Sequence, residues 1–447
     1  MEPPVPPPLP PLPRLRPADE AVAGLLAARL GDDRVDLDPG RRREASRDHA
    51  WLSPVLTAAL PDVVADVVVT PRDDVELAAA LSIAHDHGVA VTPRGKGTGN
   101  YGQAVPLAAG LVVDLGLLRG VLDVDDGWLH ARAGTSFTRM EAAARATGQE
   151  LAIFPSTSSS ALGGFLSGGA GGTGSIENGW IWDGYVGELT ALPCWDVPES
   201  QVLDADESRH HLHAYGTTGI VTGARVALRP ARRWTALLAS FADFTAAAEA
   251  GLAIADLDPV PRNLSVDDVA LVALLPEHPA MPAGRVSLRA IVDESTVEAA
   301  RRHVIGGGGR VELVDPSATA MLVGLSFNHV TLRAKRNEPS ICHLQVGGRP
   351  LVDDPGGARA VLPNGMLHLD AMSVEGRRGY GGLLLSRYVD RPTLWSGVEA
   401  LRATGVRVTD AHTWAVGGHG DLAPTIAAAE RMDPRGLLNP GKLARAA

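Results

Sequence analysis

Two polar stretches in the second half of the chain carry side chains suited to acid–base chemistry. The run SFNHVTLRAKR, residues 326–336, contains His329 and Arg333. If this run is a β-strand, both side chains lie on one face, because alternate residues of a strand point to the same side. Such a pair suits a hydroxy acid, since the guanidinium holds the carboxylate and the imidazole accepts the hydroxyl proton. A solvent-facing polar stripe on an antiparallel sheet explains the same spacing equally well.

The second stretch, AHTWAVGGHGD at 411–421, supplies His412 as another candidate base. Tyr380, within RRGYGG, is a candidate phenol, although its glycine neighbours also fit a turn. For each histidine a structural or surface role is the alternative. The HHLH run at 210–213 has no carboxylates on a defined face, so no metal site is predicted.

Three glycine-rich segments offer backbone N–H groups as anion ligands: residues 93–102, 163–179 and 214–223. Consecutive N–H groups without Cβ cover form an anion nest, and the first segment carries Arg94 and Lys96 beside it. Two segments match GxGxxG, but neither is expected to open a helix, so a Rossmann-type NAD site is disfavoured. A tight turn accounts for one such segment, whereas a dinucleotide cradled by backbone accounts for all three.

Taken in order, these segments resemble the vanillyl-alcohol oxidase/p-cresol methylhydroxylase (PCMH-type) FAD-binding flavoprotein family. The resemblance is carried by VVVTPRDDVELAAALSIAHDHGVAVTPRGKGTG, FPSTSSSALGGFLSGGAGGTGSIENG, HAYGTTGIVTGARVAL and DPRGLLNPGKL. It covers residues 63–229 and 433–443 strongly and the region between them weakly. It implies that the first half and the C-terminal segment bind FAD, and that the middle forms a cap over the isoalloxazine.

The resemblance also implies which residues line FAD. The first loop would hold the pyrophosphate, the third would lie along the adenine, and the C-terminal signature would return near the flavin. Many members attach FAD through His or Cys in these loops. Here Thr98 and Gly99 occupy the usual place of a linking His, so non-covalent FAD is expected, with a link through His329 as the alternative. The implied FAD-binding residues are Pro93, Arg94, Gly95, Lys96, Gly97, Thr98, Gly99, Asn100, Thr157, Gly163, Gly164, Gly174, Ser175, Ile176, Gly219, Ile220, Val221, Asn439 and Lys442.

The elements around these motifs predict an α+β fold: a two-subdomain PCMH-type FAD-binding domain plus an α+β cap with an antiparallel sheet. A strand at 63–71, a helix at 73–88 and a strand at 89–95 form a βαβ unit that leads into the first loop. Beyond residue 232, strands alternate with Ala-rich helices, as in a separate α+β domain. The expected divisions are a Pro-rich tail with a helix and loop at 1–57, the FAD-binding domain at 58–231, the cap at 232–409, and a returning C-terminal segment at 410–447.

Composition limits the partners of this chain of 447 residues. A formal charge of −11 without a basic tail argues against nucleic acid, and no long apolar run suggests a membrane span. The start, MEPPVPPPLPPLPRLRP, has no apolar signal core and is expected to be a passive polyproline II tail, with an SH3-like partner as the alternative. Two cysteines fit a reducing cytoplasm. Only three of 41 basic residues are lysines, Lys96, Lys335 and Lys442, so these positions merit attention.

These features together predict an FAD-dependent oxidase or dehydrogenase. It would transfer hydride from an alcohol, hydroxy acid or similar CH–XH group of a small molecule to flavin N5, with no metal. A flavoenzyme of secondary metabolism with a non-redox or ring-forming role is the alternative. A nucleotide-binding scaffold is disfavoured, because a scaffold has no use for three glycine loops.

Overall fold

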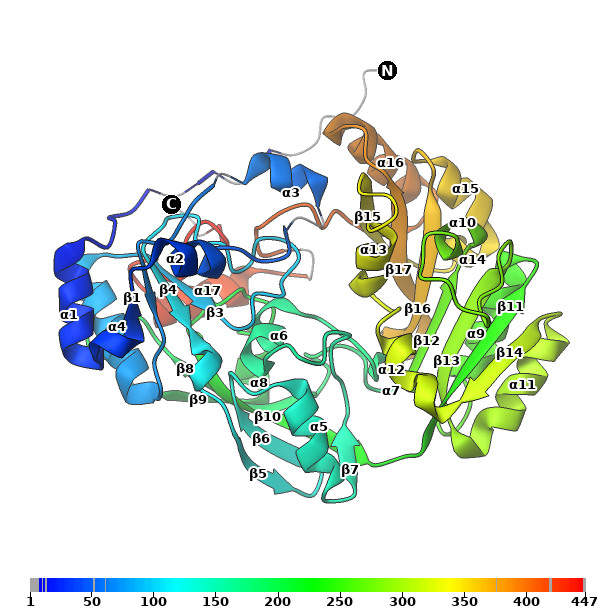
Figure 1. The fold of residues 1–447 in the computed structure, drawn as a ribbon, viewed down its shortest axis with the longest axis horizontal. Helices are drawn as coiled ribbons and strands as arrows, with labels where there is room; N and C mark the ends of the chain where they lie inside the picture. The colour runs from blue at the N-terminus through cyan, green and yellow to red at the C-terminus, as the bar shows by residue number, and fades with distance from the viewer. Residues whose placement is uncertain are drawn as a thin grey trace.

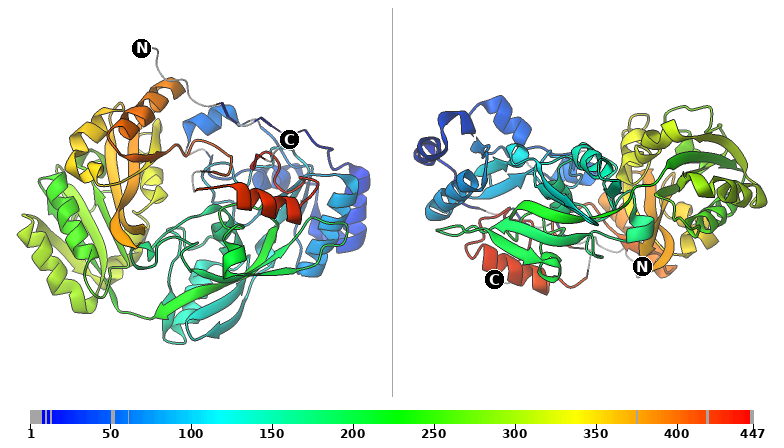
Figure 2. Two further views of the ribbon diagram at one scale, coloured as in Figure 1. Left: turned by 180° about the vertical axis from the view of Figure 1, so that it is seen from behind. Right: turned by 90° about the horizontal axis from the view of Figure 1, so that it is seen from below.

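The computed structural model describes residues 8–444 except 10, 13, 51–52, 61, 375 and 418–419, so part of the predicted Pro-rich tail lies outside the described residues. The described chain forms three sheets (Figures 1 and 2). Two sheets occupy the half that contains the glycine-rich segments, and the third forms the other half. The chain is therefore α+β, as the sequence predicts.

The first sheet is mostly parallel and has the strand order β1-β2-β4-β3. The helix α4 (Asp74–His87) connects β2 to β3. It begins where the Asp73 side chain accepts the N–H groups of Val75 and Glu76, and it ends at Gly88, whose φ is 66°. This is the predicted βαβ unit. Its strands are β1 (Val35–Asp36), β2 (Val67–Val69), β3 (Val91–Arg94) and β4 (Leu111–Asp114), and α1 (Glu20–Leu30) packs on α4.

The second sheet is antiparallel and has the order β5-β6-β10-β8-β9, with β7 paired to the end of β10. Its apolar face packs against the helix that follows β6 and against the helix at the start of the second glycine-rich segment. The elements are β5 (Val121–Asp125), β6 (Trp128–Arg132), α5 (Phe137–Arg145), β7 (Gln149–Leu151), α6 (Leu162–Gly168), α7 (Ser175–Asn178), β8 (Val186–Leu192), β9 (Gln201–Asp204), α8 (Ala205–Ser208) and β10 (Ile220–Pro230).

The third sheet forms the cap and is antiparallel throughout, in the order β14-β11-β13-β12-β16-β17-β15-β18. Alternate residues of its strands bury two cores, one on each face. The strands are β11 (Trp234–Phe241), β12 (Asn263–Asp267), β13 (Val286–Asp293), β14 (Arg310–Asp315), β15 (Ile341–Gly347), β16 (Met366–Val374), β17 (Arg377–Arg387) and β18 (Arg407–Thr409).

Helices cover both faces of the cap sheet. The outer face, away from the glycine-rich half, packs against α9 (Phe244–Ala255), α11 (Val297–Gly306), α14 (Pro350–Asp353), α15 (Pro355–Ala360) and α16 (Arg391–Ala403). The opposite face packs against α10 (Val269–Val272), α12 (Thr319–Val323) and α13 (Asn328–Ala334). Because α12 and α13 lie between the cap sheet and the other half, we call this face the inner face (Figure 1).

The prediction of a strand at 326–336 is wrong, because this run forms α13. Val330 and Ala334, four residues apart, are buried on the inner face, so helical spacing prevails over the apparent alternation. The expected loop after Gly174 also contains a one-turn helix, α7. Among the described residues, no helix has the length and hydropathy that a membrane crossing requires.

After β18 the chain returns to the glycine-rich half. There α17 (Ala423–Met432) buries Met432 in the core of the second sheet. Leu438 then pairs with Val91 of β3, and the Val91 N–H donates to the carbonyl of Leu437. The last described segment is thereby held beside the first glycine-rich loop.

Candidate functional site

The first and second glycine-rich loops face each other where β3 ends and α6 begins. A Cβ built on Gly95 would lie 3.6 Å from the Ala161 Cβ and 3.7 Å from the Gly164 Cα, whereas one built on Gly164 would enter open space. At Gly163 it would meet the Ala133 Cβ at 2.7 Å, so helix α6 approaches β6 too closely for any side chain. The two loops therefore form a cradle lined by backbone.

The second loop is held from both sides. Gly174 has φ of 98°, and a Cβ there would collide with the Ala152 carbonyl. Its N–H donates to the Arg262 carbonyl of the cap at 2.7 Å. The Ser175 hydroxyl accepts the Gly172 N–H at 3.0 Å, and Ile176 packs against the cap core. The loop thus touches both halves of the molecule.

Two residues of the C-terminal signature fix the first and third loops. The Asn439 amide donates to the carbonyls of Gln103 and Tyr215 at 2.8 and 2.7 Å. The fully buried Lys442 ammonium donates to the Gly102 carbonyl. Burial lowers the pKa of Lys442 to about 7, although the nearby Asp48 carboxylate opposes this effect. Both side chains therefore bind carbonyl groups of the loop backbone.

The other residues predicted in the loops have varied surroundings. Arg94 donates to the Arg47 carbonyl at 2.5 Å and covers Gly97, where a Cβ would collide with its guanidinium. The Lys96 side chain is exposed. Lys335, the residue after α13, donates to the carbonyls of Pro339 and Ile341. Half-buried loop positions are Pro93, Thr98, Gly99 and Asn100, whereas Gly219, Ile220 and Val221 are buried at the start of β10.

The first loop meets the inner face of the cap at Tyr101. Its hydroxyl lies 2.7 Å from the His343 Nε2 and accepts the Asn328 amide at 3.0 Å. The His343 Nδ1 lies 3.0 Å from the Thr331 hydroxyl. Burial, with a smaller effect of His412, lowers the pKa of His343 to about 3, so this imidazole is neutral at physiological pH. Burial likewise raises the pKa of Tyr101 and keeps its hydroxyl protonated.

His412 lies beside this pair, as a buried histidine oriented by a carboxylate. Its ring centroid is 6.3 Å from that of His343, and its Nδ1 lies 2.6 Å from the Asp410 Oδ1. Burial alone would raise the pKa of Asp410, but the hydrogen bond and charge of His412 lower it below its ordinary value. Because Nδ1 serves Asp410, the His412 Nε2 is the nitrogen that can accept a proton.

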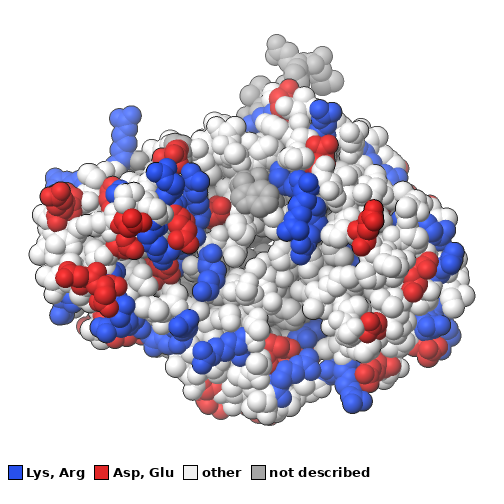
Figure 3. Space-filling view, viewed as in Figure 1, with Lys and Arg blue, Asp and Glu red and all other residues white. Residues whose placement is uncertain are grey.

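The predicted pair His329 and Arg333 shares one face of a helix and not one face of a strand. In α13 the two residues are four apart and therefore share a helix face. The His329 Nε2 lies 3.0 Å from the Thr157 hydroxyl of the second loop. Burial lowers the pKa of His329, and the charge of Arg333 lowers it further. Figure 3 shows Lys and Arg side chains on both flanks of the hollow between the halves.

Tyr380 is placed away from this site, which contradicts its prediction as a catalytic phenol. It lies in β17 and is buried in the core of the outer face, where its hydroxyl donates to the Ala248 carbonyl of α9 at 2.8 Å. Strand alternation decides this outcome, because Tyr380 and Leu384 share the outer face whereas Leu383 and Leu385 share the inner one.

Sequence reasoning missed Tyr101, His343 and Asp410. Tyr101 directly follows the predicted loop residue Asn100, so its position was a usable signal. In ICHLQVG, the apolar Cys342 and Leu344 alternate with His343, which marks the latter as lying on the other face. Such alternation identifies the face of a residue but not which loop of the other half meets it.

Four charged residues are buried on the inner face of the cap: Arg289, Asp267, His368 and Asp370, which we call the buried charge chain. Each is at most 2% exposed. The Arg289 guanidinium lies 2.6 Å from Asp267, and the His368 imidazole lies 2.5 Å from Asp267 and 2.8 Å from Asp370. No group of three or more His, Cys, Asp or Glu among the described residues is arranged to hold a metal ion.

The buried charge chain predicts a loss of stability at alkaline pH. Burial would lower the pKa of His368, but the two carboxylates outweigh it and raise it to about 9. Because this pKa is higher in the folded state than the unfolded value near 6.5, the protonated His368 stabilises the fold by roughly 3 kcal/mol below pH 6.5. This contribution is lost as the pH rises through 9. The melting temperature of the wild type should therefore fall more than that of His368→Gln between pH 6.5 and 9.5. Parallel curves would contradict this assignment.

Arg262 connects the cap to the other half. Its guanidinium lies 3.0 Å from Glu141 and 3.7 Å from the buried Glu150, and 4.8 Å from the Phe154 ring centroid. We expect Arg262→Ala to lower the free energy of unfolding by about 3 kcal/mol, because it leaves Glu150 less compensated. The control is Arg233→Ala, directly before β11, where an exposed pair with Glu294 is worth about 0.5 kcal/mol. Equal effects in chemical denaturation would refute the role of Arg262.

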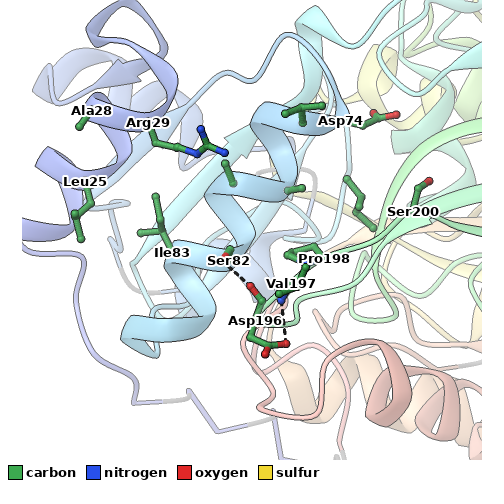
Figure 4. A pocket seen from close by; sticks show the side chains of 14 residues that line it. Leu25, Ala28, Arg29, Asp74, Ser82, Ile83, Asp196, Val197, Pro198 and Ser200 are labelled. Carbon is green, nitrogen blue, oxygen red and sulfur yellow. Dashed lines mark hydrogen bonds between the residues drawn. The ribbon is translucent and has the colours of Figure 1, made fainter.

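A wide apolar groove of about 700 Å³ lies elsewhere, between α1, α4 and the segment that precedes β9 (Figure 4). The Ser82 hydroxyl donates to the Asp196 carbonyl across it at 2.6 Å. None of the residues lining the groove belongs to a glycine-rich loop or to the cap. The chemistry-bearing side chains are therefore not in this groove.

Comparisons with known proteins agree with the arrangement of the loops. Residues 65–191 match a family described as the FAD binding domain. This match includes the first and second glycine-rich segments and supports the resemblance to the PCMH-type FAD-binding family. The chain is 31% identical over 183 residues to an uncharacterized FAD-linked oxidoreductase of Mycobacterium tuberculosis. This match covers 39% of the present chain and 40% of the relative. The chain is 27% identical to a glycolate oxidase subunit of Bacillus subtilis, over 48% of this chain and 47% of the relative.

Among solved structures, alkyldihydroxyacetonephosphate synthase matches with a TM-score of 0.74 and 15% identity, over 94% of this chain and 86% of that one. This likeness concerns the fold alone. The chain spans between two fifths and one half of the length of the two curated relatives described above. For this FAD-binding protein, activity and substrate are consequently matters of proposal.

The residues of the cradle fit FAD. Around the loops, the Ser160 and Thr173 hydroxyls and the Asn439 Oδ1 are buried without a hydrogen-bond partner among the described residues. Buried polar atoms are normally satisfied, so such atoms suit a ligand rich in donors and acceptors. The open space above Gly164 leaves room for this ligand between the loops.

Proposed function

We propose that this protein is an FAD-dependent oxidoreductase that oxidises the CH–OH group of a small hydroxy acid or alcohol. The observation that carries the proposal is His412, held by Asp410 next to the contact between the FAD loop and the cap. When bound, FAD supplies the acceptor for the hydride equivalent. In this proposal residues 58–231 and 410–447 bind FAD without a covalent link, and residues 232–409 form the cap.

The proton of the substrate hydroxyl passes to the His412 Nε2. Asp410 holds the imidazole in the tautomer with a proton on Nδ1 and stabilises the imidazolium that forms. His412 is 2% exposed, so few waters compete for its nitrogen. A buried base of this kind acts in a low dielectric, where the attraction between Asp410 and the imidazolium is strong.

Tyr101 and His343 form a fixed polar surface beside His412. The Tyr101 hydroxyl is bonded to His343, Asn328 and Gln345, so its position is fixed before a substrate binds. The neutral His343 does not compete for the proton, because burial holds its pKa near 3. The Tyr101–His343 pair therefore bounds the space beside His412, and His412 removes the proton of the substrate hydroxyl.

A carboxylate on the substrate would bind Arg333 of α13, with His329 beside it. Three relatives support a hydroxy acid: the glycolate oxidase subunit of Bacillus subtilis, the D-2-hydroxyglutarate dehydrogenase of Escherichia coli and the D-lactate dehydrogenase of Archaeoglobus fulgidus. Lys and Arg side chains on both flanks of the hollow attract anions, although Asp and Glu side chains lie among them on the left flank in Figure 3 and the chain charge is −11. The site thus favours hydroxy acids over neutral alcohols.

The test is anaerobic mixing of the yellow holoenzyme with paired substrates. Glycolate, D-lactate and D-2-hydroxyglutarate are compared with alcohols of matched size that lack the carboxylate, and bleaching of the flavin absorbance is followed. We expect a hydroxy acid to bleach the flavin, and Arg333→Met to raise the KM for that acid more than for an alcohol. If none of the compounds bleaches the flavin, the redox proposal fails and a non-redox role gains support.

A further inference from the structure

The two ends of the buried charge chain hold one short segment of the cap. At one end, the Asp370 carboxylate accepts the Phe327 N–H at 3.1 Å. At the other end, the Arg289 guanidinium donates to the Leu325 carbonyl at 2.9 Å. Both contacts fall on the three residues directly before α13. The chain therefore connects strands β12, β13 and β16 to the start of this helix.

Burial of four charges needs a reason beyond stability. The free energy that a buried ion pair loses by desolvation is generally about as large as the free energy gained from attraction between its charges. Apolar residues of similar size often stabilise the fold equally well. The Ser265 hydroxyl also donates to Asp370 at 2.7 Å, so that carboxylate is hydrogen-bonded on both oxygens. These bonds fix the position of the Asp370 carboxylate, whereas the Arg289 Nε, at the other end of the chain, has no hydrogen-bond partner among the described residues.

The held segment has an unfavourable backbone conformation. Phe327 has φ of 50° and ψ of −145°, a region that only glycine adopts readily. Residues in such conformations persist when their surroundings hold them. Here the contact that holds the Phe327 N–H is the Asp370 carboxylate.

Helix α13 begins at the next residue and reaches the site. Asn328 donates to the Tyr101 hydroxyl, and Thr331 lies 3.0 Å from the His343 Nδ1. We propose that the buried charge chain is a positioning device, which holds Phe327 in its strained conformation and so presents Asn328 and Thr331 to the Tyr101–His343 pair. Asp370 is the positioning residue in this device and acts through Phe327.

The test couples Asp370 to the backbone of residue 327. Asp370→Ala is made in the wild-type holoenzyme and in Phe327→Gly, where glycine removes the strain that Asp370 opposes. Amide hydrogen exchange is measured in peptides covering 325–336. We expect Asp370→Ala to speed exchange about tenfold or more in the wild type and about threefold or less in the glycine background.

An equal acceleration in both backgrounds would overturn the proposal. Asp370→Asn should rescue slow exchange, because its amide oxygen still accepts the Phe327 N–H. If Asp370→Ala does not fold, Asp370→Ser takes its place, since serine is polar but too short to reach that N–H. As a control for generic destabilisation, Glu312→Gln removes a charge from the far edge of the cap, where Glu312 accepts from Ser240, and should leave α13 unchanged.

The kinetic part of the inference rests on the proposed function, whereas the exchange part does not. With a substrate that bleaches the flavin, Asp370→Ala should lower kcat about tenfold with little change in KM, and Phe327→Gly should reduce this loss. If no substrate is found, the proposed function fails while hydrogen exchange still decides the positioning role. If exchange shows no coupling in an active enzyme, only the positioning role fails.

Discussion

Replacement of His412 by alanine is expected to slow the reduction of FAD by substrate by about 10²–10⁴-fold, the usual contribution of a general base. FAD binding should be unchanged, because His412 hydrogen-bonds Asp410 and not the loops of the cradle. The rate is measured by anaerobic stopped flow at saturating substrate.

Asp410→Asn refines the assignment of the base. The amide leaves the size of residue 410 unchanged but favours the opposite tautomer of His412, so the rate should also fall. The matched control is His329→Gln, at the other histidine predicted from the sequence. The His329 side chain contacts Thr157 and not the Tyr101–His343 pair. His329→Gln should therefore slow flavin reduction by less than about tenfold. A large loss in His329→Gln with normal rates in His412→Ala would move the base to α13.

The cofactor half follows from the sequence because its signals are local. Each glycine loop is one continuous segment, and its backbone needs no distant residue to define it. The α4 helix likewise has its cap at Asp73 and its stop at Gly88 within 16 residues. A single sequence therefore shows where the glycine loops lie, and it predicts that a dinucleotide is held there.

The cap site does not follow from the sequence, because antiparallel pairing assembles it. Asp267 and His368 are 101 residues apart and become neighbours through the register between β12 and β16. Tyr101 and His343 are 242 residues apart and meet only when the cap packs on the first loop. Neither a motif nor a spacing encodes these contacts.

The run 326–336 shows how a local rule fails at this boundary. Its polar residues alternate as in a strand, but burial of Val330 and Ala334 against the sheet selects a helix. His329 and Arg333 lie on one face in either element, because residues four apart share a face both in a strand and in a helix. The prediction of the pair was thus independent of the element that carries it.

Gly164→Leu is expected to abolish FAD binding while leaving the protein folded. Gly164 is exposed in α6, and a Cβ there meets no atom within 4 Å, so the side chain starts in open space. Leucine also favours a helix over glycine by roughly 0.8 kcal/mol. Its side chain would fill the space between α6 and the first loop. FAD affinity should fall at least about 100-fold, equivalent to about 2.7 kcal/mol.

The neighbouring glycine provides the contrast that makes this prediction decisive. A Cβ on Gly163 would meet the Ala133 Cβ at 2.7 Å, so Gly163→Ala should lower the melting temperature of the apoprotein. Gly164→Leu should instead melt as the wild-type apoprotein does, yet purify without colour and take up no FAD in a titration of flavin fluorescence. A yellow Gly164→Leu protein with normal FAD affinity would show that the cofactor does not lie between the two loops. Because Gly163 and Gly164 are adjacent in α6, the comparison separates a residue that contacts the protein from one that faces the cradle.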